Sequence, residues 1–363
     1  MEKEYYDSLK AMKRKYDLLS RKEAFSGSTK EEWISWKEQM KKRLWDLLGM
    51  DNMESCDLCP TEEETVVLEN GITRKKVRIQ TEPDVWMPFF ELIPPEREQK
   101  REVFLALAGH GGAGKYGVAG CREIPVMRQA IERHHYDYGM KLAEMGYTVF
   151  CPDPRGFGER REAARQSGRE EDFLNGSCYE LAHMAEPLGM TVAGMQTWDL
   201  MRLLDYVQMR ADIGECTMEN LGCVGFSGGG MQTLWLTALD DRIRRALTSG
   251  YLYGVKDSLL ELNQNCSCNY VPGLWRVLDM GDLASMAAPR PFIVQTGISD
   301  GLNGKRGAVN ADEQMETVRR AYRLFDAENV LIHHHYPGGH QFHYEDLAED
   351  LSKSCRNNQE KEK

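Results

Sequence analysis

The sequence predicts an α/β fold, with a mostly parallel central sheet and helices on both of its faces. From residue 103 onward, short apolar segments alternate with segments whose apolar residues recur at helical spacing. Two of the apolar segments, 103–108 and 221–225, each end in a glycine-rich loop. Strand–helix alternation of this kind is typical of parallel sheets that are buried on both faces.

The first 60 residues differ in character from the rest. They are rich in Lys and Glu, and apolar residues recur at helical spacing from Trp33 to Leu48, just before Gly49. We predict a helical arm over residues 1–60 that packs on the main domain or contacts a second subunit.

The main domain is predicted over residues 61–351 and begins with antiparallel strands. Val66–Leu68 leads into Asn70-Gly71, a dipeptide typical of hairpin turns, and the return strand contains Val77 and Ile79. A third short strand is expected at Val85–Ile93.

The same apolar periodicity predicts the later elements of the domain. Strands are predicted at residues 103–108, 147–151, 221–225, 243–247, 291–295 and 330–335. Helices are predicted at residues 136–145, 197–209, 231–239 and 312–325. Long polar or irregular segments near 159–190 and 251–287 are expected to form a cap or lid over the sheet. Residues 352–363 are predicted to be a disordered tail.

The composition and net charge of the chain disfavour nucleic-acid and membrane binding. The 363 residues are 41% hydrophobic and 28% charged, with a formal net charge of −11, as in a globular protein with no basic surface for nucleic acid or an anionic membrane. No basic and apolar leader opens the chain, and no apolar run approaches the length of a membrane-spanning helix. We therefore expect a cytoplasmic protein without nucleic-acid or membrane partners.

The ten cysteines do not show a disulfide or zinc pattern. Cys56 and Cys59 form a CxxC pair, and Cys266 and Cys268 form a CxC pair far along the chain. No histidine or cysteine cluster with zinc-site spacing accompanies them. We expect reduced, structural thiols and no metal site.

The loop Gly109–Tyr116 fits three motifs. It matches the dinucleotide fingerprint GxGxxG, the phosphate-loop start GxxxxGK, and the His110-Gly111-Gly112 type of segment that supplies an oxyanion-hole N–H. Tyr116 stands where a phosphate loop needs Ser or Thr, and the following Gly and Pro residues disfavour a dinucleotide-binding helix. The oxyanion interpretation needs only a flexible backbone, which glycine provides.

The segment Gly225–Gly229 matches the nucleophile motif G-x-S-x-G. It joins an apolar strand to a helix, the context that a nucleophile elbow requires. Ser227 is therefore the candidate nucleophile, and the N–H of Gly228 is a candidate oxyanion donor. The alternative is a tight strand-to-helix turn with an incidental serine.

A serine nucleophile needs a base, and His340 is the best placed of nine histidines. It lies in a glycine-rich turn after the last predicted strand, with His343 as the second choice. The run His333–His335 resembles a metal ligand set, but neighbouring strand residues point to opposite faces, so we interpret it as strand surface.

The base in turn needs an acid, and Asp300 follows the predicted strand 291–295 in a loop. The alternative for Asp300 is an ordinary Asp-Gly turn. The order Ser227, Asp300, His340 is that of α/β-hydrolases, with each partner after a strand.

At these residues the chain resembles bacterial α/β-hydrolases related to acetyl xylan esterases and dienelactone hydrolases. The similar stretches are 109–112, 146–160, 222–230, 269–273, 279–284, 288–292 and 339–342. The resemblance implies an α/β-hydrolase fold, with the family's nucleophile, acid and base on Ser227, Asp300 and His340. Dienelactone hydrolases use a cysteine nucleophile, so the serine favours the esterase branch.

We predict a serine carboxylesterase that acts on short-chain, acetyl-type esters, such as acetylated sugars, and uses no cofactor. Arg155, Asn269 and Tyr270 are candidate pocket residues, because their loops leave the carboxyl edge of the sheet; a structural role is the alternative for each. Another acyl hydrolase (peptidase, amidase, thioesterase or lactonase) and a non-catalytic binding protein on the same fold remain alternatives. The N-terminal arm is a candidate homo-oligomer contact.

Overall fold

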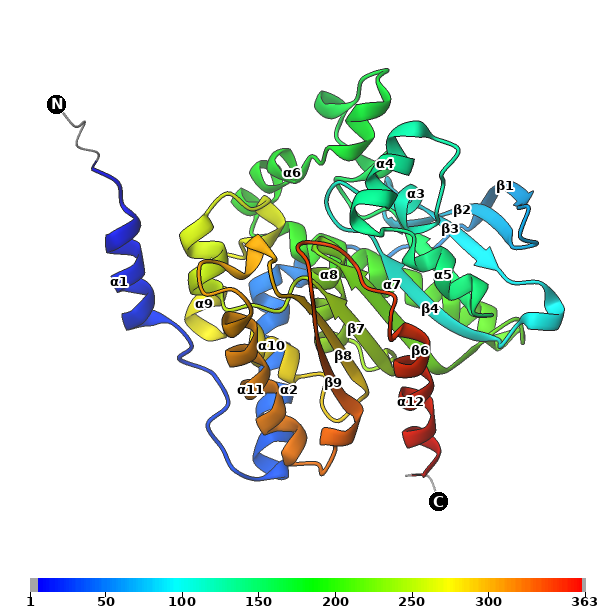
Figure 1. The fold of residues 1–363 in the computed structure, drawn as a ribbon. Helices are drawn as coiled ribbons and strands as arrows, with labels where there is room; N and C mark the ends of the chain where they lie inside the picture. The colour runs from blue at the N-terminus through cyan, green and yellow to red at the C-terminus, as the bar shows by residue number, and fades with distance from the viewer. Residues whose placement is uncertain (1–5, 361–363) are drawn as a thin grey trace.

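The computed structural model describes residues 6–360 and contains one nine-stranded sheet with the order β1-β2-β3-β5-β4-β6-β7-β8-β9 (Figure 1). The strands are β1 (Thr61–Val67), β2 (Thr73–Glu82), β3 (Val85–Ile93), β4 (Glu102–Leu107), β5 (Thr148–Pro152), β6 (Thr217–Phe226), β7 (Arg245–Ser249), β8 (Phe292–Gly297) and β9 (Leu331–Tyr336). Strands β1 to β3 pair antiparallel, and β3 joins β5 in the antiparallel sense. The pairs from β5 to β9 are parallel. The predicted sheet, with its antiparallel N-terminal strands, is confirmed.

The central strands are buried on both faces. Along β4, Leu105 and Leu107 face one apolar cluster while Phe104 and Ala106 face the other, because successive strand side chains point to opposite sides. The first cluster is covered by α2 (Lys30–Leu48), α7 (Val192–Asp212), α8 (Gly228–Leu239), α10 (Met280–Ser285) and α11 (Ala308–Arg323). The second is covered by α3 (Lys115–Val118), α4 (Pro125–His134), α5 (Tyr138–Glu144) and α12 (Leu347–Glu360).

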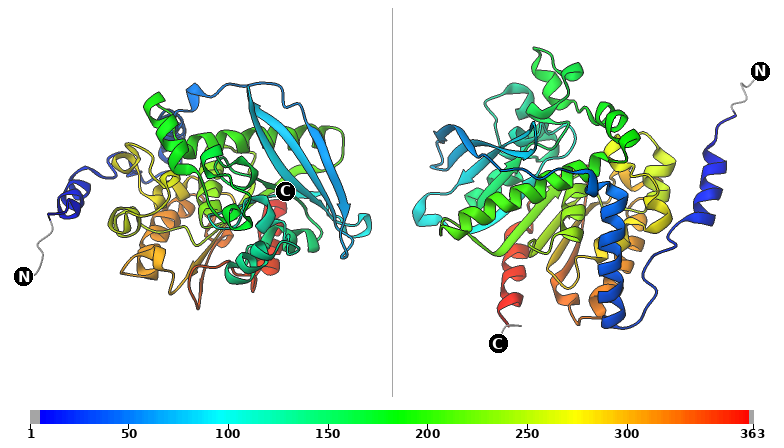
Figure 2. Two further views of the ribbon diagram at one scale, coloured as in Figure 1. Left: turned by 90° about the horizontal axis from the view of Figure 1, so that it is seen from above. Right: turned by 180° about the vertical axis from the view of Figure 1, so that it is seen from behind.

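The N-terminal arm consists of two helices that differ in burial. In α2, a capping box between Thr29 and Glu32 starts the helix, and Gly49 ends it with a φ of 72°. Helix α1 (Leu9–Leu19) buries no side chain and lies along the outside of segment 251–287 (Figure 2). Polar contacts attach this part of the arm, among them the paired hydrogen bonds of Arg21 to Asp282, both 2.8 Å long.

The C-terminal segment differs from the prediction. A disordered tail was expected over residues 352–363, but α12 continues to Glu360, and residues 361–363 lie outside the described part of the chain. The helix is anchored by Leu347 and Leu351, which are buried against the sheet. None of the helices between residues 6 and 360 is long and apolar enough to cross a membrane.

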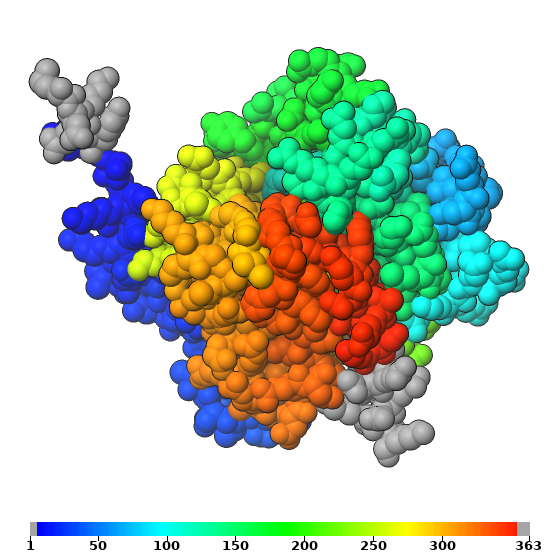
Figure 3. Space-filling model, in the orientation of Figure 1, coloured from blue at the N-terminus to red at the C-terminus, as the bar shows by residue number. Residues whose placement is uncertain are grey.

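Two long insertions follow the carboxyl ends of β5 and β7 and together form what we call the cap; the end of the second, α10, packs beside α8 and α11. Residues 159–190 contain short 3-10 turns and α6 (Cys178–Ala185). Residues 251–287 contain a π-turn (Lys256–Leu260), a 3-10 turn (Ser267–Asn269), α9 (Leu274–Val277) and α10. In the space-filling view these green and yellow segments border the 110–135 segment at one end of the molecule (Figure 3).

Candidate active site

Ser227 occupies a strained turn between β6 and α8. Its φ of 57° and ψ of −123° are rare for a residue with a side chain, and its N–H donates to the carbonyl of Ser249 over 2.9 Å. The turn is possible because its neighbours are glycines: a Cβ on Gly229 would lie 1.9 Å from the carbonyl oxygen of Leu107. Ser227 is 6% exposed at the carboxyl edge of the sheet. This geometry matches the predicted elbow.

The loop after β4 lies directly against this elbow. A Cβ on Gly109 would come within 3.1 Å of both the amide nitrogen of Gly228 and the Cβ of Ser227. Gly228 is the first residue of α8, so its N–H belongs to the helix end whose amides have no partner within the helix. Two backbone segments that carry N–H groups therefore converge beside the Ser227 side chain, as an oxyanion site requires.

The predicted donors in the loop differ in position. The imidazole of His110 lies over Gly228, since a Cβ there would be 2.6 Å from His110 Nδ1. Gly112 packs against the ring of Tyr136, and its carbonyl accepts from Gly117 N over 3.1 Å. Gly111 has a φ of 73° and borders open space. The backbone at Gly109 and His110 is thus nearer to the elbow than Gly112.

His340 and Asp300 form a close pair. His340 Nδ1 lies 2.7 Å from Asp300 Oδ2, and Asp300 is 3% exposed, at the start of the turn that follows β8. The His340 ring contacts the elbow region: its centroid is 4.5 Å from that of Phe226. One ring nitrogen faces the acid, which leaves Nε2 for proton exchange with a hydroxyl.

His343, the second choice as base, has a different environment. It is 2% exposed, and its ring stacks on Tyr336 at 4.1 Å. Burial lowers the pKa of His343, which favours a neutral, packed ring. The structure therefore pairs His340, and not His343, with the candidate acid.

The histidine run on β9 needs a correction. Adjacent residues do point to opposite faces, but His333 and His335 share one face and lie close to Asp312. His335 Nε2 is 2.8 Å from Asp312 Oδ1, and His333 Nε2 is 2.9 Å from the hydroxyl of Thr296. Burial lowers the pKa of His333 to about 3, so this ring is neutral. The run is more than strand surface: all three rings take part in polar contacts, since His334 Nε2 also lies 2.9 Å from Asp350 Oδ2.

Lys115, the lysine of the GxxxxGK match, is fully buried and engaged elsewhere. Its Nζ lies 2.6 Å from Asp153 Oδ2 and 3.2 Å from Glu159 Oε2. The helix that begins at Lys115 has only four residues before the chain turns again. A phosphate loop needs a free lysine and a dinucleotide site a longer helix, so neither alternative fits.

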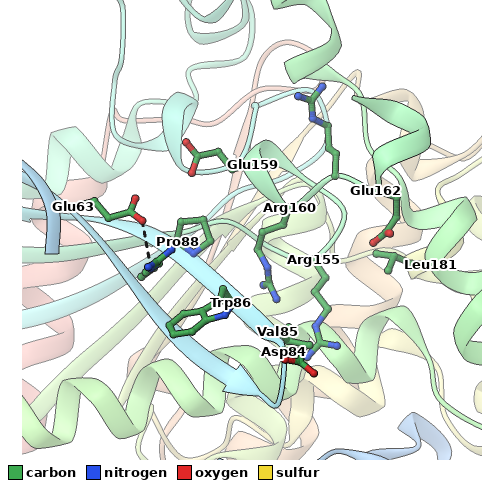
Figure 4. Close-up of a pocket in the computed structure, with 12 residues that line it drawn as sticks. Glu63, Asp84, Val85, Trp86, Pro88, Arg155, Glu159, Arg160, Glu162 and Leu181 are labelled. Carbon is green, nitrogen blue, oxygen red and sulfur yellow. Dashed lines mark ion pairs between the residues drawn. The ribbon is translucent and has the colours of Figure 1, made fainter. Parts of the chain in front are cut away.

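Two of the three candidate pocket residues, Arg155 and Tyr270, line cavities whose lining does not include Ser227. Arg155 pairs with Asp199 at 2.8 Å and with Glu82, and it lines a cavity of about 510 Å³ between the β2–β3 hairpin and the first cap segment (Figure 4). Ser227 is not among the residues that line this cavity. Tyr270 donates to the carbonyl of Leu259 over 3.1 Å and lines a separate surface hollow.

Asn269 is buried, and its side-chain polar atoms have partners within the protein. Its side-chain oxygen accepts from Tyr251 over 2.7 Å, and its Nδ2 donates to the Cys266 carbonyl over 3.0 Å and to the sulfur of Cys268 over 3.6 Å. The contacts of Arg155, Asn269 and Tyr270 are those of residues that hold loops in place.

Sequence reasoning missed a cluster next to the oxyanion loop. The ligand-type atoms of His110, Cys178, Cys266 and Cys268 all lie within 4.8 Å of one another. The CxC pair at 266–268 was a visible signal, but its partners come from two other loops. Only the folded chain brings the three segments together, which is why no spacing rule finds them.

Comparisons with known proteins give a match to a family model and to a curated relative. The model of the Abhydrolase family matches residues 6–355. The chain is 29% identical over 193 residues to YtaP, a suspected hydrolase of Bacillus subtilis (strain 168); the match covers 53% of this chain and 59% of that protein. The chain thus matches less than two thirds of this curated relative.

Solved structures share the fold at low sequence identity. A suspected acetyl xylan esterase of Bacteroides fragilis has a TM-score of 0.73 at 18% identity, with 92% of this chain and 83% of that one covered. A glucuronoyl esterase from Solibacter usitatus has a TM-score of 0.67 at 15% identity, with 93% and 96% covered. These likenesses show a shared architecture and leave the substrate open.

Proposed function

The chain belongs to the Abhydrolase family of α/β-hydrolases, and from that premise we propose that it is a serine esterase that uses Ser227, His340 and Asp300. The family match and the esterase neighbours support an ester-hydrolysing enzyme. The finer proposal concerns which residues act and on which esters.

The proposed reaction is acyl transfer through Ser227. His340 takes the proton of the Ser227 hydroxyl as the oxygen attacks the ester carbonyl, and Asp300 holds the imidazole and stabilises its charged form. Backbone N–H groups of Gly228 and of the His110 segment donate to the oxyanion. The alcohol leaves with the proton from His340, and water then releases the acid by the same steps in reverse.

One observation carries this proposal: the His340–Asp300 pair, with Nδ1 and Oδ2 2.7 Å apart, packs against Phe226, the residue that precedes a serine held at positive φ. A strained serine costs folding free energy, of order 1–3 kcal/mol, and such strain is concentrated at functional sites. An incidental turn serine would need neither the strain nor a buried histidine–carboxylate pair.

We further propose that the preferred acyl group is small, of the acetyl type. Ser227 is only 6% exposed below the cap, which favours a short acyl chain over a bulky one. The named neighbours include esterases of acetylated xylan and of glucuronoyl esters, so a sugar ester is a reasonable class to test. The alcohol part would then lie toward the cap.

The experiment is hydrolysis of nitrophenyl acetate by wild type, Ser227→Ala and the control Ser249→Ala. Ser249 is also buried at the carboxyl edge, one strand away, so its substitution tests for general damage. We expect Ser227→Ala to lower kcat by about 10⁴- to 10⁶-fold and Ser249→Ala to keep most activity. Near-normal turnover in Ser227→Ala would overturn the assignment.

A substrate panel separates the remaining alternatives. Acetyl, butyryl and feruloyl esters, acetylated xylo-oligosaccharides, a thioester, a lactone and a peptide amide would be compared by kcat/KM. The proposal predicts the highest value for an acetyl ester. A preference for the amide or the thioester would keep the triad but change the class, and inactivity on all of them would favour a binding protein.

A further inference from the structure

Four side chains from three separate loops converge beside the oxyanion segment. His110 follows β4, and Cys178 begins α6 in the first cap segment. In the second segment, Cys266 precedes a 3-10 turn and Cys268 lies within it. All their ligand-type atoms lie within 4.8 Å of one another, and His110 Nε2 is 3.3 Å from Cys268 Sγ. Cys178 and Cys268 are 1% and 2% exposed.

The separations suit a tetrahedral metal ion. Zinc binds thiolate sulfur at about 2.3 Å and imidazole nitrogen at about 2.0–2.1 Å, which places tetrahedral ligand atoms roughly 3.6–3.8 Å apart. Three sulfurs and one imidazole form a ligand set that is common in structural zinc sites, and soft thiolates favour zinc over magnesium or calcium. Four protein ligands fill the coordination shell and leave no open position for catalysis.

The ordinary alternatives account for the cluster less well. Buried thiols that act as small hydrophobes lie among carbon atoms, as Cys223 does inside the sheet, where its sulfur has one hydroxyl neighbour. A disulfide would use two of the three sulfurs and leave the third beside an imidazole. Neither alternative gives a reason for His110 to join the group.

We propose that His110, Cys178, Cys266 and Cys268 bind one Zn²⁺ ion that clamps both cap segments to the oxyanion loop. Binding converts three thiols to thiolates, releases three protons and leaves the site with one net negative charge. The Asn269 Nδ2 donates to Cys268 Sγ over 3.6 Å, and a donor of this kind disperses thiolate charge. Cys178 at the start of α6 also faces the helix end that favours an anion.

The clamp has a consequence for the neighbouring site. The His110 ring lies over Gly228, with Nδ1 2.6 Å from the place that a Cβ of that residue would take, while Nε2 faces the cluster. Metal coordination at Nε2 would fix this ring and hence the backbone that carries the His110 N–H. The ion would therefore position the oxyanion loop without touching substrate.

The first test is the metal content of the 363-residue chain, expressed with zinc and purified without a chelating resin, by plasma mass spectrometry. We expect about one zinc per chain in wild type and in the control Cys216→Ser, and a loss of most of it in Cys266→Ser. Cys216 is matched to Cys266, because both are half-buried, but it lies outside the cluster. Absence of zinc from wild type, or unchanged zinc in Cys266→Ser, would overturn the proposal.

The second test uses wild type only, so that it does not depend on the folding of a variant. Native protein is alkylated with and without a zinc chelator, and the labelled cysteines are mapped by peptide mass spectrometry. The proposal predicts that chelator increases labelling of Cys178, Cys266 and Cys268 together and lowers the melting temperature. Unchanged labelling, or a disulfide between two of these residues, would contradict it, whereas the esterase assay of Ser227→Ala would be unaffected by that outcome.

Discussion

The edge of the sheet that holds the candidate triad and the cap above it are built in opposite ways. The candidate triad lies at or just after the carboxyl ends of three strands: Ser227 after β6, Asp300 after β8 and His340 after β9. At these ends, β6 and β8 are buried on both faces. The cap consists of short turns and small helices, attached by ion pairs, by the sulfur cluster and by apolar side chains that join the first core cluster. The edge owes its geometry to backbone hydrogen bonds, and the cap owes its position to side chains.

This difference corresponds to two separate requirements of a hydrolase, which are catalysis and substrate selection. Catalytic groups must stay within a fraction of an ångström of the reacting atoms, so they suit a rigid sheet edge. Substrate selection depends on loop shape, which tolerates variation provided that the loops are fastened. At the root of the cap, Lys115, Asp153 and Glu159 join the loop after β4 to the first cap segment.

The largest expected effect is at the edge that holds the candidate triad. His340→Ala should lower kcat for nitrophenyl acetate by about 10⁴- to 10⁶-fold, because Ser227 loses its base. Its control is His343→Asn, a change at a buried histidine that does not face Asp300. If His343→Asn lost as much activity as His340→Ala while remaining folded, the assignment of the base would be wrong.

The second-largest effect is expected on the free energy of unfolding, when the buried ion pair of Lys115 at the base of the cap is removed. Lys115→Met would leave Asp153, which is fully buried, without its charge partner, and we expect about 3–5 kcal/mol less free energy of unfolding. Urea unfolding measures this loss. The control Lys141→Met removes an exposed pair with Glu144 and should cost about 1 kcal/mol or less. Equal losses would mean that the buried ion pair does not hold the cap root.

A smaller effect should arise where the two regions meet. Gly228→Ala places a Cβ 2.6 Å from His110 Nδ1, and the ring cannot retreat without leaving Cys268. We expect one oxyanion donor to be displaced and kcat to fall about 10²- to 10³-fold, with KM changed little. Gly168→Ala, where a Cβ would meet nothing within 4 Å, is the control. Wild-type kcat in Gly228→Ala would exclude this amide as a donor.

The smallest expected effect is a pH dependence of the free energy of unfolding that arises from Asp199 and its arginine partners. Burial alone would raise the pKa of Asp199, but Arg155 and Arg160 outweigh it and lower the pKa to about 2. Because the folded pKa is below the unfolded value, this pair network stabilises the protein above about pH 4 and loses about 2 kcal/mol as pH falls toward 2. Urea unfolding of wild type and Asp199→Asn across this range should show the steeper decline in wild type. Parallel declines would contradict the linkage.

The sequence predicted the sheet well, for physical reasons, while the triad of Ser227, His340 and Asp300 stays a prediction. Apolar runs such as 221–225 have one stable environment, inside a parallel sheet, and the glycines around Ser227 permit one kind of turn. The hairpin at Asn70-Gly71 and the helix end at Gly49 also formed as predicted, since local backbone preferences determine both. Once the strands are predicted correctly, the positions of the residues at their ends are known as well.

The cap could not be predicted to the same degree. Arg155 was a candidate pocket residue with a structural role as the alternative, and its guanidinium binds Asp199 and Glu82, partners that are distant in sequence. Cys178 joins Cys266 and Cys268 only because two insertions meet above the sheet. Contacts of this kind depend on how loops fold back, and neither periodicity nor spacing encodes that.

The most direct test of the account is covalent labelling of the nucleophile. Wild type and Ser227→Ala would be treated with a fluorophosphonate, and the modified peptide would be identified by mass spectrometry. The account predicts one phosphonyl group per wild-type chain, on Ser227, with loss of esterase activity in step, and none on Ser227→Ala. Labelling of another residue, or full esterase activity in an unlabelled wild type, would contradict it.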